Sequence, residues 1–146
     1  MTISAVGGLA LAGAGTAAAA APRHCVADIA TCFSSEAQVD AFRPAGTAAW
    51  TELVRLYDGY NYSGDTYSLG SSEISSCTAS TGNVDAQAAN LGEFRNRTSS
   101  FVTRERCDAK LFDHTGFGGG STGYLDHSTD LRTIGFNNKA ESLLSS

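Results

Sequence analysis

The sequence is poor in the residue types that several function classes require. It has 10 Lys and Arg against 15 Asp and Glu, a formal net charge of −5, so no basic stripe is available to neutralise nucleic-acid phosphates. Only 17% of the residues are charged, below the usual quarter. The chain holds 2 Pro against 16 Gly, which suits short strands and tight turns better than long helices. We therefore expect no nucleic-acid partner and a fold rich in β-structure.

Motifs for catalysis, nucleotide binding and zinc binding are also missing. The chain has no Gly-x-Ser-x-Gly nucleophile elbow, and its glycine-rich segment 117–123 lacks the Gly-Lys-Ser/Thr of a phosphate loop. No Cys-x-x-Cys pair occurs, and the histidines His24, His114 and His127 are scattered, which argues against a zinc centre. These absences favour a binding protein over an enzyme.

The N-terminal segment is apolar and differs from the rest of the chain. Ile3 to Ala21 carries no charge, consists mostly of Ala, Gly and Leu, and ends in a run of alanines. This composition predicts a secretory signal peptide over residues 1–21, although no Lys or Arg precedes the apolar stretch. A membrane anchor is the alternative, but Ala and Gly partition weakly into hydrocarbon. We expect a secreted, extracellular protein without stable membrane insertion.

Four cysteines in a secreted chain predict disulfides, for which three connectivities exist. Cys25 and Cys32 are separated by six residues, which suits a staple across a local hairpin and leaves Cys77 to pair with Cys107. Residues 22–50 are interpreted as an N-terminal extension around the first staple. Within it we expect short strands at 26–30 and 32–33 and a helix over 36–42 that ends before Pro44.

An internal repeat dominates the remainder of the chain. The pattern aromatic-x4-aromatic-x-Gly occurs at 57–64 and again at 112–119. In each copy the two aromatics are expected to cover the same core, and the Gly to adopt a positive φ. Alternating and turn-bounded segments predict strands at 51–57, 66–69, 101–103, 109–112 and 122–125, hence an all-β fold. The first copy is 13 residues longer, and we interpret its segment 71–89 as a long loop held by Cys77.

A second, oxygen-rich half follows each hairpin motif. The hexamers are Arg-Asn-Arg-Thr-Ser-Ser at 95–100 and Asn-Asn-Lys-Ala-Glu-Ser at 137–142. Amide carbonyls, hydroxyls, a carboxylate and turn carbonyls are the hard oxygen ligands that Ca²⁺ prefers. Asn and Ser also build turns by bonding to their own backbone, so a structural role for the hexamers is the alternative.

Together the two halves resemble the βγ-crystallin family, whose hairpin motif is aromatic-x4-aromatic-x-Gly and whose microbial members carry a calcium-binding hexamer. The resemblance covers residues 51–146 and implies a double Greek-key β-sandwich, with one Greek key in 51–105 and the second in 106–146. It also implies a pair of calcium sites, in which the ligands are backbone carbonyls of the hairpin loops and hexamers together with side-chain oxygens. The implied metal-binding residues are Tyr60, Asn96, Arg97, Ser99, Thr115, Asn137, Asn138, Lys139 and Glu141.

Both hexamers depart from the family pattern, (Asn/Asp)-(Asn/Asp)-x-x-(Ser/Thr)-Ser. Arg95 replaces the first acid or amide and puts a cation beside one site, whereas Glu141 replaces a hydroxyl with a carboxylate. We predict one competent and one impaired site, the calcium claim resting most on Asn137, Asn138 and Glu141, with calcium acting mainly in stabilisation. The alternative function, also implied by resemblance, is a calcium-independent inhibitor of secreted metalloproteinases, for which the loop around Cys77 is the candidate contact.

Overall fold

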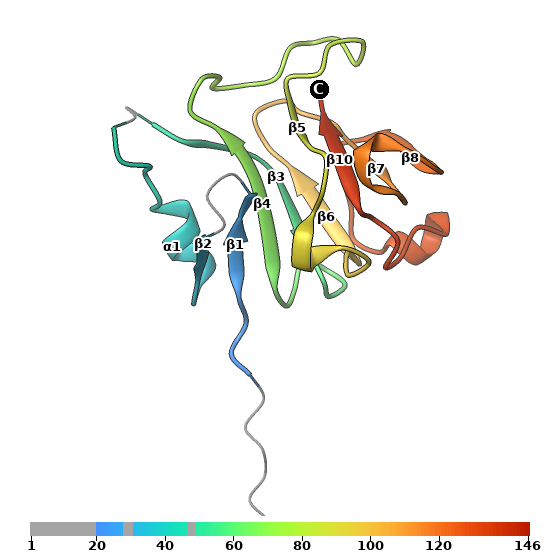
Figure 1. Ribbon diagram of the computed structural model, residues 1–146, viewed down its shortest axis with the longest axis horizontal. Helices are drawn as coiled ribbons and strands as arrows, with labels where there is room; N and C mark the ends of the chain where they lie inside the picture. The colour runs from blue at the N-terminus through green and yellow to red at the C-terminus, as the bar shows by residue number, and fades with distance from the viewer. Residues whose placement is uncertain (1–19, 28–30, 47–48) are drawn as a thin grey trace, which may run out of the picture.

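The computed structural model describes residues 20–27, 31–46 and 49–146. Most of the predicted signal peptide, residues 1–19, lies outside the described residues, as do positions 28–30 of a predicted strand. The described chain forms two β-sheets with short helical turns between their strands (Figure 1). None of its helices is long and apolar enough to cross a bilayer. The elements are, in order, β1 His24–Val26, β2 Thr31–Phe33, α1 Glu36–Asp40, β3 Thr51–Tyr57, β4 Thr66–Ser71, β5 Ala86–Ala88, η2 Gly92–Phe94, β6 Ser100–Thr103, β7 Ala109–Phe112, η3 Thr115–Phe117, β8 Ser121–Leu125, β9 His127–Ser128, η4 Leu131–Ile134 and β10 Ser142–Ser145.

Each repeat forms a four-stranded Greek key that exchanges its third strand with the other repeat. The first sheet has the order β2-β1-β4-β3-β6-β9, and the second has the order β5-β10-β7-β8. β5 of the first repeat therefore pairs with β10 of the second, while β9 of the second repeat pairs with β6 of the first. This topology confirms the predicted double Greek-key β-sandwich.

The main core lies between the two sheets and draws on both repeats. The leucines of the repeat strands, Leu56 in β3 and Leu111 in β7, are fully buried there together with Phe101 and Leu143. The Cys77–Cys107 disulfide joins the same cluster, and both of its cysteines are buried. Removing this apolar surface from water is the dominant stabilising contribution to the fold.

Both hairpin motifs have the structural role that the repeat predicts. The rings of Tyr57 and Tyr62 lie 5.7 Å apart between centroids, and those of Phe112 and Phe117 lie 5.9 Å apart. Gly64 and Gly119 have φ angles of 88° and 73°. A Cβ at either glycine would collide with the carboxylate of the aspartate that follows the first aromatic. Only glycine satisfies both demands without strain.

The N-terminal extension adds two strands to the edge of the first sheet. β1 pairs in parallel with β4, and β2 pairs antiparallel with β1 across the Cys25–Cys32 disulfide, as predicted for this staple. The short helix α1 covers the outer face of the sheet, where Val39 packs with Val26 and Trp50 in a small second core. α1 is shorter than predicted, and its N-cap Ser35 makes no side-chain capping hydrogen bond.

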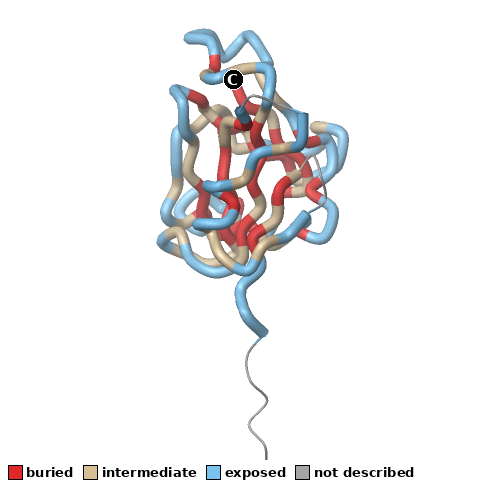
Figure 2. Tube along the Cα trace, turned by 90° about the vertical axis from the view of Figure 1, so that its left-hand side faces the viewer, coloured by how far each residue is buried: buried red, intermediate tan, exposed pale blue. Residues whose placement is uncertain are grey.

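The interpretation of 71–89 as one long loop is wrong in its last part. Residues 86–88 form β5, which crosses to the second sheet and pairs with β10. The segment 78–84 is exposed throughout and projects beside the C-terminus (Figure 2). The loop is therefore shorter than expected, and both of its ends are fixed.

Candidate metal centre

Eight of the nine predicted ligand residues gather in two clusters that each combine both repeats, and the ninth, Asn137, directly precedes Asn138. Ser99 Oγ of the first hexamer donates to Asn138 Oδ1 of the second at 3.2 Å. In the equivalent contact, Asn96 Nδ2 of the first hexamer donates to Glu141 Oε1 of the second at 2.9 Å. Backbone bonds repeat the same pseudo-twofold pairing, with Asn138 N to Thr98 O and Asn96 N to Ala140 O, both at 2.8 Å. The candidate sites are thus built between the repeats rather than within them.

The last serine of each hexamer ties one cluster to one hairpin loop. Ser100 Oγ donates to the Gly59 carbonyl at 2.6 Å and accepts from Tyr62 N at 3.0 Å. Ser142 Oγ likewise donates to the His114 carbonyl at 2.6 Å and accepts from Phe117 N at 3.0 Å. Because Ser99 and Glu141 directly precede these serines, each is held beside the loop that its neighbour contacts.

These contacts define two candidate sites. The serine site comprises Tyr60, Ser99, Asn138 and Lys139, and the glutamate site comprises Thr115, Glu141, Asn96 and Arg97. Asn138 and Glu141 therefore belong to different sites, although the sequence interpretation grouped both with the second hexamer. Arg95 directly precedes Asn96 and so lies next to the glutamate site, which also contains the Glu141 carboxylate.

The glutamate site has the stronger candidate ligand of the two sites. Glu141 supplies a half-buried carboxylate, and an anionic oxygen attracts Ca²⁺ more strongly than a neutral hydroxyl. Arg95 is exposed, and its Nε donates to the carbonyl of Gly92 at 3.2 Å. The pKa of nearby His114 is raised, first by its hydrogen bond with Asp113 and further by the charge of Glu141. Glu141 is therefore the anionic group that this site offers to a cation.

The hairpin carbonyls also differ between the sites. In the serine site, Ser63 Oγ donates to the Tyr60 carbonyl at 2.7 Å. The equivalent position in the second repeat is Gly118, which has no hydroxyl to offer the carbonyl of Thr115. The guanidinium of Arg132 lies 3.9 Å from the centroid of the Tyr60 ring and is paired with Asp130 at 2.7 Å. The sequence alignment of the repeats contains the Ser63–Gly118 difference, but its consequence depends on the loop geometry.

The donor set fits a hard cation in composition. In the described part of the chain, no three His, Cys, Asp or Glu side chains gather as a metal cluster, so carbonyl, amide and hydroxyl oxygens would have to supply most ligands. Most candidate residues are exposed or half-buried, which leaves room for water in the coordination shell. Asn137 Oδ1 and Thr98 Oγ1 are buried without a hydrogen-bond partner among the described residues. Such unsatisfied oxygens are costly and gain from an ion or water.

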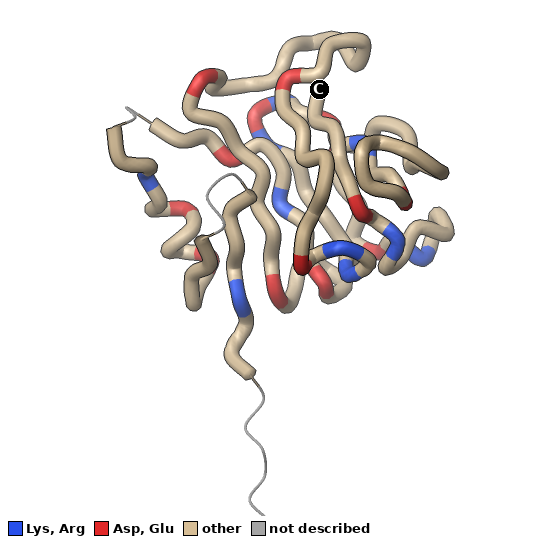
Figure 3. The backbone as a smooth tube through the Cα atoms, viewed as in Figure 1, with Lys and Arg blue, Asp and Glu red and all other residues tan. Residues whose placement is uncertain are grey.

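The side chains of Arg97 and Lys139 serve other purposes. Arg97 Nη2 lies 2.6 Å from both Asp58 Oδ2 and Asp65 Oδ2, and Lys139 Nζ donates to the Gly135 carbonyl at 2.6 Å. Both cationic groups thus point to partners outside the ligand sets, so only the backbone carbonyls of these residues are candidates. Acidic and basic residues are interspersed along the chain near the hexamers (Figure 3).

No family model and no curated protein sequence matches the chain. Among solved structures it is similar to a domain from work on the evolution of the eye-lens βγ-crystallin fold, with 20% identity, 71% of this chain and 93% of that chain covered, and a TM-score of 0.49. It is also similar to an archaeal βγ-crystallin (14% identity, 66% and 99% covered, TM-score 0.47) and to a βγ-crystallin domain from Flavobacterium johnsoniae (20%, 64% and 93%, 0.45). The assignment of a double Greek key rests on the strand order itself.

Proposed function

We propose that the chain is a non-enzymatic, extracellular calcium-binding domain in which calcium acts mainly by stabilising the fold. The observation that carries this proposal is the cross-repeat pairing of the hexamers, which places Glu141 against Asn96 next to the second hairpin loop. An ion held there would be bound by both repeats at once. A ligand that binds only the folded state stabilises it by about 2.7 kcal/mol at a hundredfold excess over Kd.

Extracellular location is part of the same proposal. The apolar residues 3–21 are typical of a secretory signal, and both disulfides are formed in the described chain. Disulfides persist in oxidising compartments, which are also rich in calcium.

Thermal unfolding in calcium and in chelator tests the proposal, together with calorimetric titration of calcium. Glu141→Gln keeps the size of the side chain but removes its charge, and it should abolish the first calcium-binding step. Ser99→Ala should leave that step intact, because Ser99 belongs to the serine site. Glu73→Gln, an exposed carboxylate outside both sites, is the matched charge control. No heat at millimolar calcium, or equal binding by Glu141→Gln, would refute the proposal.

A second candidate function is inhibition of a secreted metalloproteinase through the exposed segment 78–84. One observation favours it: the segment is held at several points, as a rigid inhibitory loop requires. The Cys77–Cys107 disulfide fixes its base, and Asp85 Oδ2 accepts from both Thr78 N and Thr78 Oγ1 at 2.8 and 2.9 Å. The C-terminal Ser146 Oγ donates to the carbonyls of Ser80 and Asn83.

The segment also presents an apolar contact. Val84 is one of two exposed large hydrophobic residues among the described residues, with 49% of its surface accessible. An inhibition assay against a thermolysin-type protease tests this second function. Inhibition that is lost in Val84→Asp but retained in Glu141→Gln, the variant expected to lose calcium binding, would support it. Intact protease activity at a molar excess of the chain would exclude it for that enzyme.

A further inference from the structure

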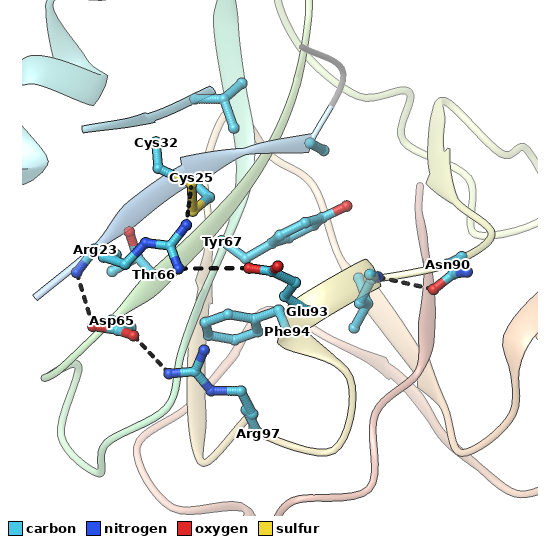
Figure 4. A pocket seen from close by; sticks show the side chains of 14 residues that line it. Arg23, Cys25, Cys32, Asp65, Thr66, Tyr67, Asn90, Glu93, Phe94 and Arg97 are labelled. Carbon is cyan, nitrogen blue, oxygen red and sulfur yellow. Dashed lines mark hydrogen bonds and ion pairs between the residues drawn. A yellow bond between two sulfur atoms is a disulfide. The ribbon is translucent and has the colours of Figure 1, made fainter. Parts of the chain in front are cut away.

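The N-terminal extension makes the first sheet wider than the sheet that faces it. β4 contacts β5, which is the last strand of the second sheet on that side. β1 and β2 continue the first sheet beyond this edge, so no strand of the second sheet in the described part of the chain lies opposite them. The space below β1 is closed instead by the turn 90–94, which includes η2. A pocket of about 420 Å³ lies between β1 and this turn (Figure 4).

The floor of the pocket is apolar. It is formed by the rings of Tyr67 and Phe94, whose centroids are 5.8 Å apart, by the buried Leu91 and by the Cys25–Cys32 disulfide. Its volume is within the range of about 300–1,000 Å³ in which small ligands are bound. An aromatic or large aliphatic group placed here would be shielded from water on the sides of the sheet and of the turn.

Two opposite charges face each other across the mouth of the pocket. Arg23 Nη1 lies 3.5 Å from Glu93 Oε2, and their side chains are 59% and 87% exposed. Figure 4 shows the guanidinium of Arg23, the residue before β1, reaching toward Glu93 on the turn. A long, exposed ion pair contributes little to stability, so both groups can exchange their partner for a ligand at low cost.

The second charged pair of the pocket is more firmly engaged. Arg97 Nη2 lies 2.6 Å from Asp65 Oδ2, and Asp65 Oδ1 also accepts from Arg23 N at 2.8 Å. Burial alone would raise the pKa of Asp65, but these hydrogen bonds from Arg23 and Arg97 lower it below its ordinary value. Asp65 is therefore held ionised by its own partners within the pocket wall. The charged side chains that remain available to a ligand are those of Arg23 and Glu93.

We propose that this pocket binds a free α-amino acid with an aromatic or large aliphatic side chain. Arg23 would pair with its carboxylate, Glu93 with its ammonium group, and its side chain would lie on Tyr67, Phe94 and the disulfide. Such a ligand carries both charges at one end and an apolar group at the other, as the pocket does. The extension thereby creates a binding site that the two Greek keys alone do not possess.

Titration of the full chain with L-phenylalanine tests this proposal. Binding is monitored by amide chemical shifts, and chelator is present so that calcium plays no part. We expect perturbations at Cys25, Tyr67 and Phe94. Loss of the charge-assisted hydrogen bond at one end should weaken binding about tenfold, so the uncharged N-acetyl-L-phenylalanine amide, which loses both, should bind about a hundredfold more weakly. The single variants Arg23→Gln and Glu93→Gln test one end each and should each weaken L-phenylalanine binding about tenfold.

The exposed Arg106→Gln and Glu73→Gln, which lie outside the pocket, are the matched charge controls and should bind L-phenylalanine like the parent chain. Unchanged thermal unfolding of the Arg23 and Glu93 variants establishes that a loss of binding is local. Equal binding of the charged and blocked probes, preferential binding of a neutral sugar such as N-acetylglucosamine, perturbations away from the pocket, or no binding at all would overturn the proposal. None of these outcomes bears on the calcium proposal.

Discussion

Replacement of Arg55 by Met should uncouple the N-terminal extension from the sandwich. Arg55 projects from β3 beneath α1 and is 1% exposed. Its guanidinium contacts three carboxylates, at 2.7 Å to Glu52, 2.6 Å to Glu36 and 2.5 Å to Asp40. Burial disfavours the charge, but the hydrogen bond and charge of Glu52 and the hydrogen bond of Asp40 nevertheless raise the pKa of Arg55. The residue is therefore a buried cation that depends on its partners.

The stability lost in Arg55→Met can be estimated from the unequal exposure of the three carboxylates. Glu36 and Asp40 are 40% and 59% exposed, so water can replace their contacts with Arg55, and each loss costs about 0–1 kcal/mol. Glu52 is only 8% exposed and keeps Arg104 at 2.7 Å and Ser68. Breaking a buried pair costs about 3–5 kcal/mol because one charge stays buried. Because Arg104 and Ser68 still contact Glu52, Arg55→Met should lower the free energy of unfolding by about 3 kcal/mol, the low end of this range, most of it through Glu52.

Urea unfolding measures this loss, with Trp50 fluorescence reporting on the extension and circular dichroism on the sheets. Trp50 is the one tryptophan of the chain and packs on Phe42 in the small second core. The double variant Arg55→Met with Glu52→Gln should recover most of the lost stability, because it also removes the buried carboxylate that loses Arg55 as its partner. Asp40→Asn is the control, with an expected loss of about 1 kcal/mol or less. Equal stability of the two Arg55 variants would refute the electrostatic reasoning.

Three further predictions concern the disulfides, the pH dependence and the packing of Trp50. Removing Cys77–Cys107 with paired Ala substitutions should cost about 3–4 kcal/mol in urea unfolding, more than removing Cys25–Cys32, because the first closes a separation of 30 residues and the second of 7. Because the pKa of Asp65 is lowered on folding, the unfolded state binds more protons, so stability present above pH 3.8 should fall as the pH drops toward the folded pKa; Asp65→Asn should flatten this part of the stability curve measured in chelator. Gly70→Ala should lower stability by about 1–3 kcal/mol and shift Trp50 emission to the red, since its Cβ would overlap the Trp50 ring. Gly82→Ala should do neither, because its Cβ would make only an ordinary contact with Ser80 Oγ at 3.5 Å.

The parts of the fold that the sequence predicts are those encoded locally. The aromatic pairs and glycines of the hairpin motifs, and strands such as β3 with its alternating side chains, depend on residues close in the chain. β5 and β9 have no such signal: Ala86–Ala88 contains no β-branched or aromatic residue, and His127–Ser128 is two residues long. They are strands because β10 and β6 present edges that need partners.

In the candidate sites, too, local features could be predicted from the sequence and long-range contacts could not. Residue types in the hexamers predict oxygen ligands, but their assignment to two sites depends on which hexamer faces which loop. That pairing is set by Ser100 and Ser142, which bond to carbonyls 41 and 28 residues away. The pocket under β1 is equally hidden, since parallel pairing of β1 with β4 joins segments that no turn connects. In both cases the feature that could not be predicted from the sequence is the pairing of segments far apart in the chain.

The two candidate sites also differ in what calcium would have to displace. In the serine site, the hydroxyls of Ser63 and Ser99 already satisfy the Tyr60 carbonyl and Asn138 Oδ1, and a neutral hydroxyl gains little by changing partners. In the glutamate site, one neutral amide bonds to the Glu141 carboxylate, so a divalent cation replaces a weak partner of a full charge with a strong one. Stabilisation by calcium should therefore saturate with one ion, and Ser63→Gly, which gives the first repeat the residue of the second, should bring the serine site closer to binding.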